Sequence, residues 1–219
     1  MQHELREFPN DHDLALAAGE YVLACARRAV KASGRFSIAL SGGKTPAAMF
    51  AVLASSALPW DRTTIYQVDE RVVAPNDPAR NLSLLLDAFA MVPADIRAMP
   101  VDDEDLDDAA DRYGAELPEF FDLVHLGLGP DGHTASLPPG DPVLQVEDRP
   151  VALTQPYLGH RRMTLTYPTL DHAHHVLWLV SGADKRHALD LLLRSDPSIP
   201  AGRVQARSSL VMSSVAATA

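Results

Sequence analysis

The chain has 219 residues, 47% hydrophobic and 22% charged, a balance ordinary for a folded protein, and we predict a single domain over residues 1–219. Its formal net charge of −10 argues against nucleic acid as a main partner, because binding a polyanion requires clustered Lys and Arg. The single cysteine, Cys25, excludes an intrachain disulfide and a thiolate zinc cluster. With no signal-peptide pattern and no run of about 20 apolar residues, we expect a cytoplasmic protein without a membrane partner.

Helices and strands alternate along the chain. Apolar residues at helical spacing predict a first helix over Leu14–Val30, with Asp11 or Asp13 as its N-cap and Ser33-Gly34 as its end. Further helices are predicted over Pro46–Ser55 and Leu82–Ala90, over the acidic run Asp102–Asp111 with Tyr113 and Leu117 at helical spacing after it, and up to Arg194. Strands are predicted over Phe36–Leu40, Thr63–Val68, Phe121–Leu128, Met163–Tyr167, Val176–Val180 and within Ser208–Ala216. This alternation predicts a three-layer α/β/α fold around a mainly parallel, doubly wound, Rossmann-like sheet.

Three of the predicted strands end in polar segments, which are Ser41–Thr45, Asp69–Arg71 and Asp131–Ser136. The carboxyl ends of parallel strands meet at one edge of a sheet, and ligands bind there. In the first segment, Gly42 and Gly43 allow backbone N–H groups to approach an anion at a helix N-terminus. The segment matches neither the P-loop nor the dinucleotide fingerprint, so an ordinary tight turn stays an alternative.

The apolar run that ends in Asp131 and His133 delivers these two side chains together to the predicted crevice. An imidazole changes charge near neutral pH, so His133 is the candidate general base. Asp131 would orient the imidazole or stabilise its protonated form. His125 lies inside the same strand, and we interpret it as a hydrogen-bonded core residue.

Two other clusters have competing interpretations. Asp69 and Glu70 are either a second catalytic pair or structural partners of the neighbouring Arg71. The histidines near Asp171 (His172, His174 and His175) suggest a metal site, but adjacent side chains of a strand point to opposite faces, and we predict no metal.

Five blocks together resemble the glucosamine-6-phosphate isomerase/6-phosphogluconolactonase family, in the family's order and over about residues 10–205. The blocks are Leu40–Pro46, Asp69–Arg71 followed by Asn81, Gly127–Leu137, Arg162–Thr166 and Gly182–Lys185. Within the family, the deaminase pattern has an Asn-Glu pair after its Asp-Gly-His and a tyrosine after Asp-Glu. Thr134–Leu137 and Arg71 stand at those places here, and both differences favour the lactonase.

The resemblance implies hydrolysis of 6-phosphoglucono-1,5-lactone to 6-phosphogluconate, the second step of the oxidative pentose phosphate pathway, by a monomer or homodimer without a cofactor. The implied catalytic residues are His133, Asp131 and Arg71, with Arg71 serving either the oxyanion or the phosphate. The implied substrate-binding residues are Gly42, Gly43, Lys44, Thr45, Asp69, Arg162 and Lys185.

The chain departs from the family pattern at Pro138–Gly140, where Phe-Pro is usual, and at Tyr157–Arg161, so that Arg161 competes with Arg162 for the ligand. Its C-terminal segment also lacks the family's tryptophan and acidic residue, although we still expect a strand there. Two alternatives to the lactonase stay open: a hexose-phosphate isomerase or deaminase, which needs another acid near His133, and a non-catalytic sugar-phosphate sensor.

Overall fold

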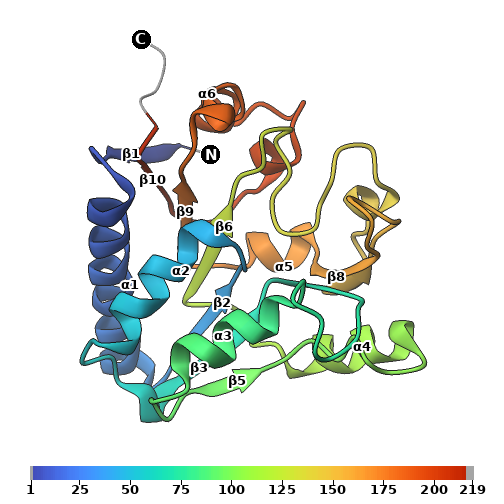
Figure 1. The fold of residues 1–219 in the computed structure, drawn as a ribbon, viewed down its shortest axis with the longest axis horizontal. Helices are drawn as coiled ribbons and strands as arrows, with labels where there is room; N and C mark the ends of the chain where they lie inside the picture. Colours follow the sequence, from blue (N-terminus) through green and yellow to red (C-terminus); the bar gives the residue numbers. More distant parts are fainter. Residues whose placement is uncertain (1, 216–219) are drawn as a thin grey trace.

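A seven-stranded, fully parallel sheet forms the centre of the computed structural model, which describes residues 2–215 (Figure 1). Its strand order is β1 (His3–Glu7), β10 (Ser209–Ser213), β9 (Val176–Val180), β6 (Leu123–Gly127), β2 (Phe36–Leu40), β3 (Thr63–Gln67) and β5 (Asp95–Arg97). Helices cover both faces of the sheet, and the predicted α/β fold class is confirmed.

Alternating side chains of the central strands belong to two hydrophobic clusters, one on each face of the sheet. Ile38 and Leu123 point to the face covered by α1 (Asp11–Ser33), α2 (Lys44–Ala54) and α3 (Asn81–Phe89). Ala39 and Val124 point to the opposite face, which is covered by α4 (Leu106–Glu116), α5 (Tyr167–Asp171) and α6 (Arg186–Leu193). Both faces of the central strands are buried, and this explains their nearly continuous apolar sequences.

The winding of the sheet reverses between its neighbouring strands β2 and β6. From β2 the chain continues outward through β3 and β5, and it then returns to β6 and continues through β9 and β10 on the other side. The Ser41 hydroxyl, directly after β2, donates a hydrogen bond to the carbonyl oxygen of His125 in β6, 3.1 Å away. A doubly wound sheet binds its ligands beyond the strand ends at such a point.

A second sheet of three antiparallel strands corrects two of the sequence predictions. It consists of β4 (Asp69–Arg71), β8 (Arg162–Leu165) and β7 (Val151–Leu153). Asp69–Arg71 is therefore a strand in its own right and not the polar end of β3. The strand predicted over Met163–Tyr167 ends at Leu165. Tyr167 instead begins α5, and the proline that follows it is favourable in the first turn of a helix.

Several element boundaries also differ from the prediction. The cap of α1 is Asn10 and neither Asp11 nor Asp13, because the Asn10 side chain accepts a hydrogen bond from the backbone N–H of Asp13. Gly34 ends that helix at φ 78°, a left-handed conformation that favours glycine. The sequence analysis missed the short strands β1, β5 and β7. The predicted C-terminal strand forms β10, while Ala216 lies outside the described residues.

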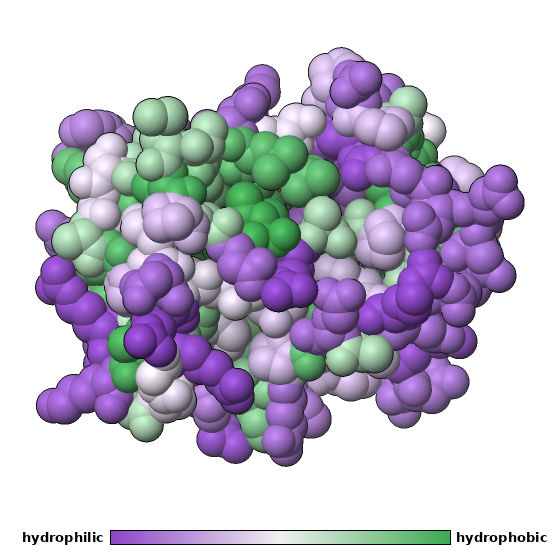
Figure 2. All heavy atoms as spheres, turned by 90° about the horizontal axis from the view of Figure 1, so that it is seen from below, coloured by the Kyte–Doolittle hydropathy of each residue, from purple (hydrophilic) through white to green (hydrophobic). Residues whose placement is uncertain are grey.

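The acidic run Asp102–Asp111 ends in α4, whose aspartates face solvent while its Ala109, Ala110 and Tyr113 are buried. Hydrophilic side chains cover the side of the molecule on which α4 lies (Figure 2). Within residues 2–215, no helix combines the length and the apolar character needed to cross a membrane.

Candidate active site

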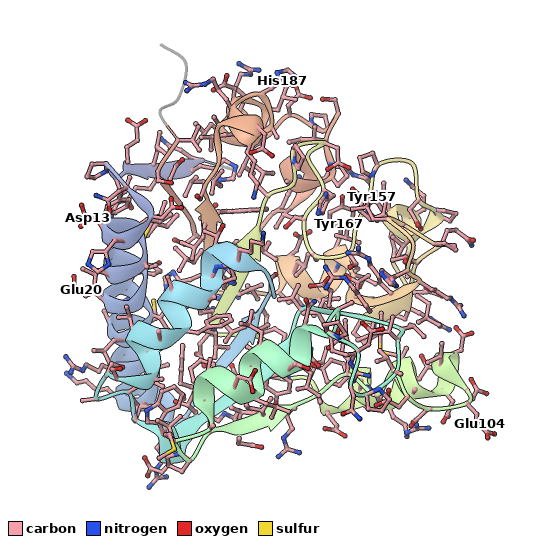
Figure 3. All side chains as sticks on the ribbon, in the orientation of Figure 1. Asp13, Glu20, Glu104, Tyr157, Tyr167 and His187 are labelled. Atoms are coloured by element: carbon pink, nitrogen blue, oxygen red, sulfur yellow. The ribbon has the colours of Figure 1, made fainter. Side chains whose placement is uncertain are left out.

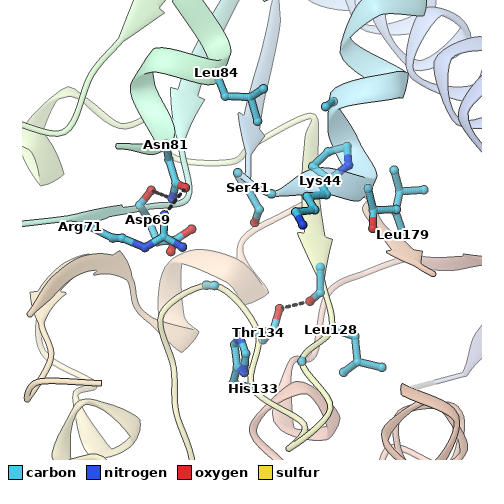
Figure 4. A pocket seen from close by; sticks show the side chains of 18 of the residues that line it. Ser41, Lys44, Asp69, Arg71, Asn81, Leu84, Leu128, His133, Thr134 and Leu179 are labelled. Carbon is cyan, nitrogen blue, oxygen red and sulfur yellow. Dashed lines mark hydrogen bonds between the residues drawn. The ribbon is translucent and has the colours of Figure 1, made fainter. Parts of the chain in front are cut away.

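A cavity of ≈ 640 Å³ opens at the carboxyl ends of β2 and β6, where the winding of the sheet reverses (Figure 4). Its walls come from the segment after β2 (Ser41–Ala47), from β4 and the start of α3, and from the segment after β6 (Gly127–Ala135). Leu179 of β9, Lys185 and Arg162 complete the lining. The three polar segments that were predicted to share one sheet edge therefore meet in one cavity.

The glycine loop presents the N-terminus of α2 to this cavity. Gly43 is the residue before the helix and adopts φ 122°, which favours glycine. A Cβ atom on Gly42 would lie 2.2 Å from Oδ1 of Asn81, so the loop packs tightly against the start of α3. Lys44 and Thr45 form the first turn of α2 beside free backbone N–H groups, an arrangement that favours an anion.

Asp131 and His133 form a hydrogen-bonded pair on the loop after β6. Nδ1 of His133 lies 2.6 Å from Oδ1 of Asp131, and the backbone N–H of His133 also donates to that oxygen. The imidazole lines the cavity, whereas Asp131 lies behind it and is not part of the lining. Gly129 makes this possible, because a Cβ atom there would lie 2.0 Å from Nδ1 of His133.

Arg162 of β8 lines the cavity from the small sheet and takes part in a buried chain of hydrogen bonds with Ser136 and Asp69. The Ser136 hydroxyl donates to Oδ2 of Asp69 at 2.6 Å, and Nη1 of Arg162 lies 3.4 Å from the same hydroxyl. Burial raises the pKa of Asp69, against the opposing effects of Ser136 and Arg162, and burial lowers the pKa of Arg162. Nε of Arg162 is buried and makes no hydrogen bond to the described part of the chain, so it is an available donor.

Arg71 lines the cavity beside Asp69 and Asn81 and is held by the segment at the start of α3 (Figure 4). Its guanidinium donates to the carbonyl oxygen of Ala79 and lies 3.4 Å from Oδ1 of Asn81. Asn81 in turn donates to the carbonyl oxygen of Asp69 at 3.0 Å. The cation is thereby fixed at the cavity wall.

Glu70 points away from the cavity into the protein, which favours the structural interpretation over the catalytic one. Its carboxylate is fully buried and accepts hydrogen bonds from the backbone N–H groups of Asn81 and Leu82 at the N-terminus of α3. It also pairs with the buried Arg80 at 3.4 Å. Glu70 therefore anchors the helix and strand that hold Arg71 and Asn81.

The structure brings together all the residues proposed from the sequence: ten positions, of which nine line the cavity and Asp131 supports His133. The side chain of Arg161, in contrast to that of Arg162, is exposed and is not part of the lining. The sequence analysis did not find Tyr157, whose hydroxyl donates to Oδ2 of Asp131 at 2.7 Å. A tyrosine in a polar loop gives no signal of a contact made 26 residues away in the chain.

The histidines near Asp171 lie outside the cavity and pack in other ways. His172 and His174 stack against Phe120, and β9 begins only at Val176, after all three histidines. The described residues contain no group of three or more His, Cys, Asp or Glu side chains arranged to hold a metal ion.

The fold and the cavity define a class of protein: a doubly wound α/β protein with a histidine–aspartate pair and several cations at the reversal of its sheet. Residues 9–212 match the model of the family described as glucosamine-6-phosphate isomerases/6-phosphogluconolactonase. The chain is 36% identical over 203 residues to a 6-phosphogluconolactonase of Nostoc sp., covering 86% of this chain and 84% of that protein. The chain belongs to this family.

Solved structures show that one fold serves more than one activity in this group. The 6-phosphogluconolactonase of Thermotoga maritima superposes with a TM-score of 0.88 at 24% identity, covering 97% of this chain and 99% of that one. A monomeric glucosamine-6-phosphate deaminase superposes with a TM-score of 0.83 at 17% identity, covering 96% and 97%. The fold alone therefore does not separate lactonase from deaminase, and the side chains of the cavity must do so.

Proposed function

We propose that this protein hydrolyses 6-phosphoglucono-1,5-lactone to 6-phosphogluconate, with His133 as the general base. The observation that carries the proposal is the His133–Asp131 pair in a cavity that otherwise carries mainly cations. The name of the Nostoc relative supports the same substrate. A lactone that carries a phosphate needs a base at one end and positive charge at the other.

The hydrogen bond to Asp131 sets the role of the imidazole. An ionised carboxylate only accepts hydrogen bonds, so Nδ1 of His133 carries the proton and Nε2 has the free lone pair. In the proposed reaction, Nε2 removes a proton from a water molecule while the water oxygen bonds to the lactone carbonyl carbon. The tetrahedral intermediate then expels the ring oxygen, which takes the proton from the imidazolium, and a carboxylic acid forms and ionises.

The cations of the cavity suit the two negative charges of this reaction. Backbone N–H groups at the start of α2, with Lys44 and Thr45, supply an anion site. Arg162 and Lys185 line the same cavity, and we assign them to the phosphate. Arg71 adds a permanent positive charge to the anionic substrate and intermediate.

The carboxylates of the cavity favour the lactonase over the isomerase or deaminase. Among the residues that the structure describes, Asp69 is the only acid in the lining, and it is held by Ser136 beside Arg162. The segment Thr134–Leu137 adds no acid to the wall beside His133. Hydrolysis of an activated ester needs one base, and the second acid that the isomerase or deaminase needs is missing from that wall.

The direct test mixes the purified protein with freshly generated 6-phosphogluconolactone and follows acid release against the spontaneous rate. We expect a rate well above background that a chelator does not change. Glucosamine 6-phosphate is the comparison substrate, for which we expect no release of ammonia. A lactone rate equal to background would refute the proposal, and ammonia release would support the deaminase instead.

A further inference from the structure

Tyr157 lies behind the candidate base and contacts both members of the His133–Asp131 pair. Its hydroxyl is 2.7 Å from Oδ2 of Asp131 and 3.2 Å from Nδ1 of His133, and the two rings meet edge to face with centroids 5.4 Å apart. Tyr157 does not line the cavity. From this position Tyr157 can hold the His133–Asp131 pair in place, and it does not contact a substrate in the cavity.

The hydrogen bonds among Tyr157, Asp131 and His133 determine which of these groups carries each proton. Burial and the neighbouring Asp131 raise the pKa of Tyr157 to about 12, so the phenol keeps its proton and donates it to Oδ2. Burial raises the pKa of Asp131, but the hydrogen bonds from Tyr157 and His133 outweigh this and leave it below its ordinary value. With both carboxylate oxygens accepting, Nδ1 of His133 must be a donor, and the tyrosine oxygen is a second, weaker acceptor for it.

A tight hairpin between β7 and β8 places Tyr157 there (Figure 3). The backbones of Tyr157 and His160 exchange two hydrogen bonds, of 2.9 and 3.2 Å, across a two-residue turn. Leu158 and Gly159 in this turn have φ values of 49° and 85°, as in the turns that favour hairpins. The hairpin thus presents the ring from a paired backbone, and its β8 strand also carries Arg162.

The ring of Tyr157 also contacts that arginine. The guanidinium carbon of Arg162 lies 5.3 Å from the ring centroid, within the range of a cation–π contact. One side chain thus links the candidate base, through its hydroxyl, to a candidate phosphate cation, through its ring.

We propose that Tyr157 is a positioning residue for the reaction: its hydroxyl fixes Asp131 and the protonated Nδ1 of His133 so that Nε2 accepts the proton of water, and its ring holds Arg162 for the phosphate. This inference rests on the proposed function. The two contacts belong to different parts of the side chain, so two substitutions separate them.

Replacing Tyr157 by Phe removes the hydroxyl and keeps the ring. Without the hydroxyl, Asp131 loses the donor on Oδ2 and Nδ1 of His133 loses its second acceptor, so the imidazole is held less firmly in the Nδ1–H tautomer. The other charged groups that line the cavity are unchanged in this variant. They are Lys44, Asp69, Arg71, Arg80, Arg162 and Lys185.

For Y157F we expect a kcat about tenfold lower, because one hydrogen bond to a charged group is lost, and a KM within about twofold of wild type. Tyr157→Leu removes the ring as well, and we expect the same kcat loss together with a KM raised about fivefold, since Arg162 loses its aromatic partner.

Tyr167 offers a matched control, because its hydroxyl donates to the carbonyl oxygen of Pro200 at 2.9 Å and its ring lies under Arg203 at 4.8 Å, outside the cavity. We expect Y167F to keep the wild-type kcat and KM and the wild-type tautomer of His133. Wild-type kcat in Y157F would overturn the proposal. A lower kcat with an unchanged His133 tautomer would also overturn it, because that result indicates packing alone.

An NMR measurement of the His133 tautomer separates failure of this proposal from failure of the proposed function. The ring nitrogens of His133 report the tautomer directly, without substrate. We expect Nδ1–H in the wild type, and in Y157F a measurable fraction of the other tautomer, with the proton on Nε2. If the wild type does not hydrolyse the lactone, the proposed function fails, and the spectra still decide whether Tyr157 holds the imidazole. Identical tautomer populations in both proteins would overturn the role of Tyr157.

Discussion

Two histidines of one chain segment, the interior of β6 and the loop that follows it, have opposite surroundings. His125, inside the strand, is fully buried, and neither ring nitrogen has a hydrogen-bond partner in the described residues. His133, eight positions later, has a side chain 23% exposed, a carboxylate at 2.6 Å and a face on the cavity. The prediction that His125 is a hydrogen-bonded core residue is therefore wrong about its hydrogen bonds. It is a core residue whose ring packs edge-on against Phe50, with centroids 6.3 Å apart.

The difference supports His133 over His125 as the proposed base. Burial without a partner lowers the pKa of His125 to about 3, so that its ring is uncharged at neutral pH. A ring that titrates in this way and has no access to the cavity does no proton transfer. The proposed base needs both access to the cavity and an oriented partner, and of these two histidines His133 has both.

Replacing each histidine in turn tests this comparison with the largest expected effect. We expect His133→Ala to lower kcat on the lactone about a thousandfold, within the usual contribution of a general base. His125→Leu keeps kcat within about twofold, since its ring is outside the cavity lining and packs against Phe50. Steady-state rates corrected for spontaneous hydrolysis measure both. Equal losses in the two variants would break the comparison.

A side chain at Gly129 would occupy the space next to the His133–Asp131 pair and so disturb its geometry without removing either residue. A Cβ atom on Gly129 would lie 2.0 Å from Nδ1 of His133 and 2.7 Å from Oδ1 of Asp131. We expect Gly129→Ala to lower kcat about a hundredfold, because the ring must move by about 1 Å. The far-ultraviolet circular dichroism of the variant should match that of the wild type. An active Gly129→Ala enzyme would show that the observed pair geometry is not required.

His133 shares the cavity with several cations, whereas His125 does not line it. Replacing Arg162 tests whether one of these cations binds the substrate. We expect Arg162→Met to raise KM about 30-fold or more, as for loss of one member of a buried charge contact, with a smaller change in kcat. Arg161→Met is the matched control, since that neighbouring side chain is exposed and outside the lining. The opposite pattern, a high KM in the Arg161 variant, would assign the ligand contact to Arg161.

The smallest expected effect concerns stability and belongs to His125. Its pKa is near 3 in the folded state and near the ordinary 6.5 when unfolded, so the unfolded chain binds more protons between these values. His125 therefore lowers the free energy of unfolding as the pH falls below 6.5, with a slope of up to about 1.4 kcal/mol per pH unit.

Urea unfolding of the wild type and His125→Leu at pH 7.5, 6, 5 and 4.5 measures this contribution. The leucine variant should be more stable by about 1 kcal/mol at pH 7.5, because a buried polar group without a partner is removed. Its advantage should grow toward low pH. A constant difference between the two proteins at all pH values would show that His125 is not kept neutral by burial.

The sequence was informative where the chemistry is carried by short, ordered segments. Gly42-Gly43-Lys44 and Asp131–His133 follow buried strands, so their place at one edge of the sheet could be predicted from chain order alone. The small sheet could not be predicted, because Asp69–Arg71 pairs with Arg162–Thr164, far along the chain and without a local signal. Glu70 and Tyr157 depend on this second sheet, and their roles become visible only once its strands are paired.

The central claim is that His133 supplies the chemistry of the cavity while the loop before α2 and the cations supply binding. Calorimetric titration of His133→Ala with 6-phosphogluconate, the proposed product, tests this separation most directly. We predict a Kd within about threefold of the wild-type value for a variant that has lost its turnover. Binding lost together with turnover would contradict the account, because it would place the phosphate site and the base on the same side chain.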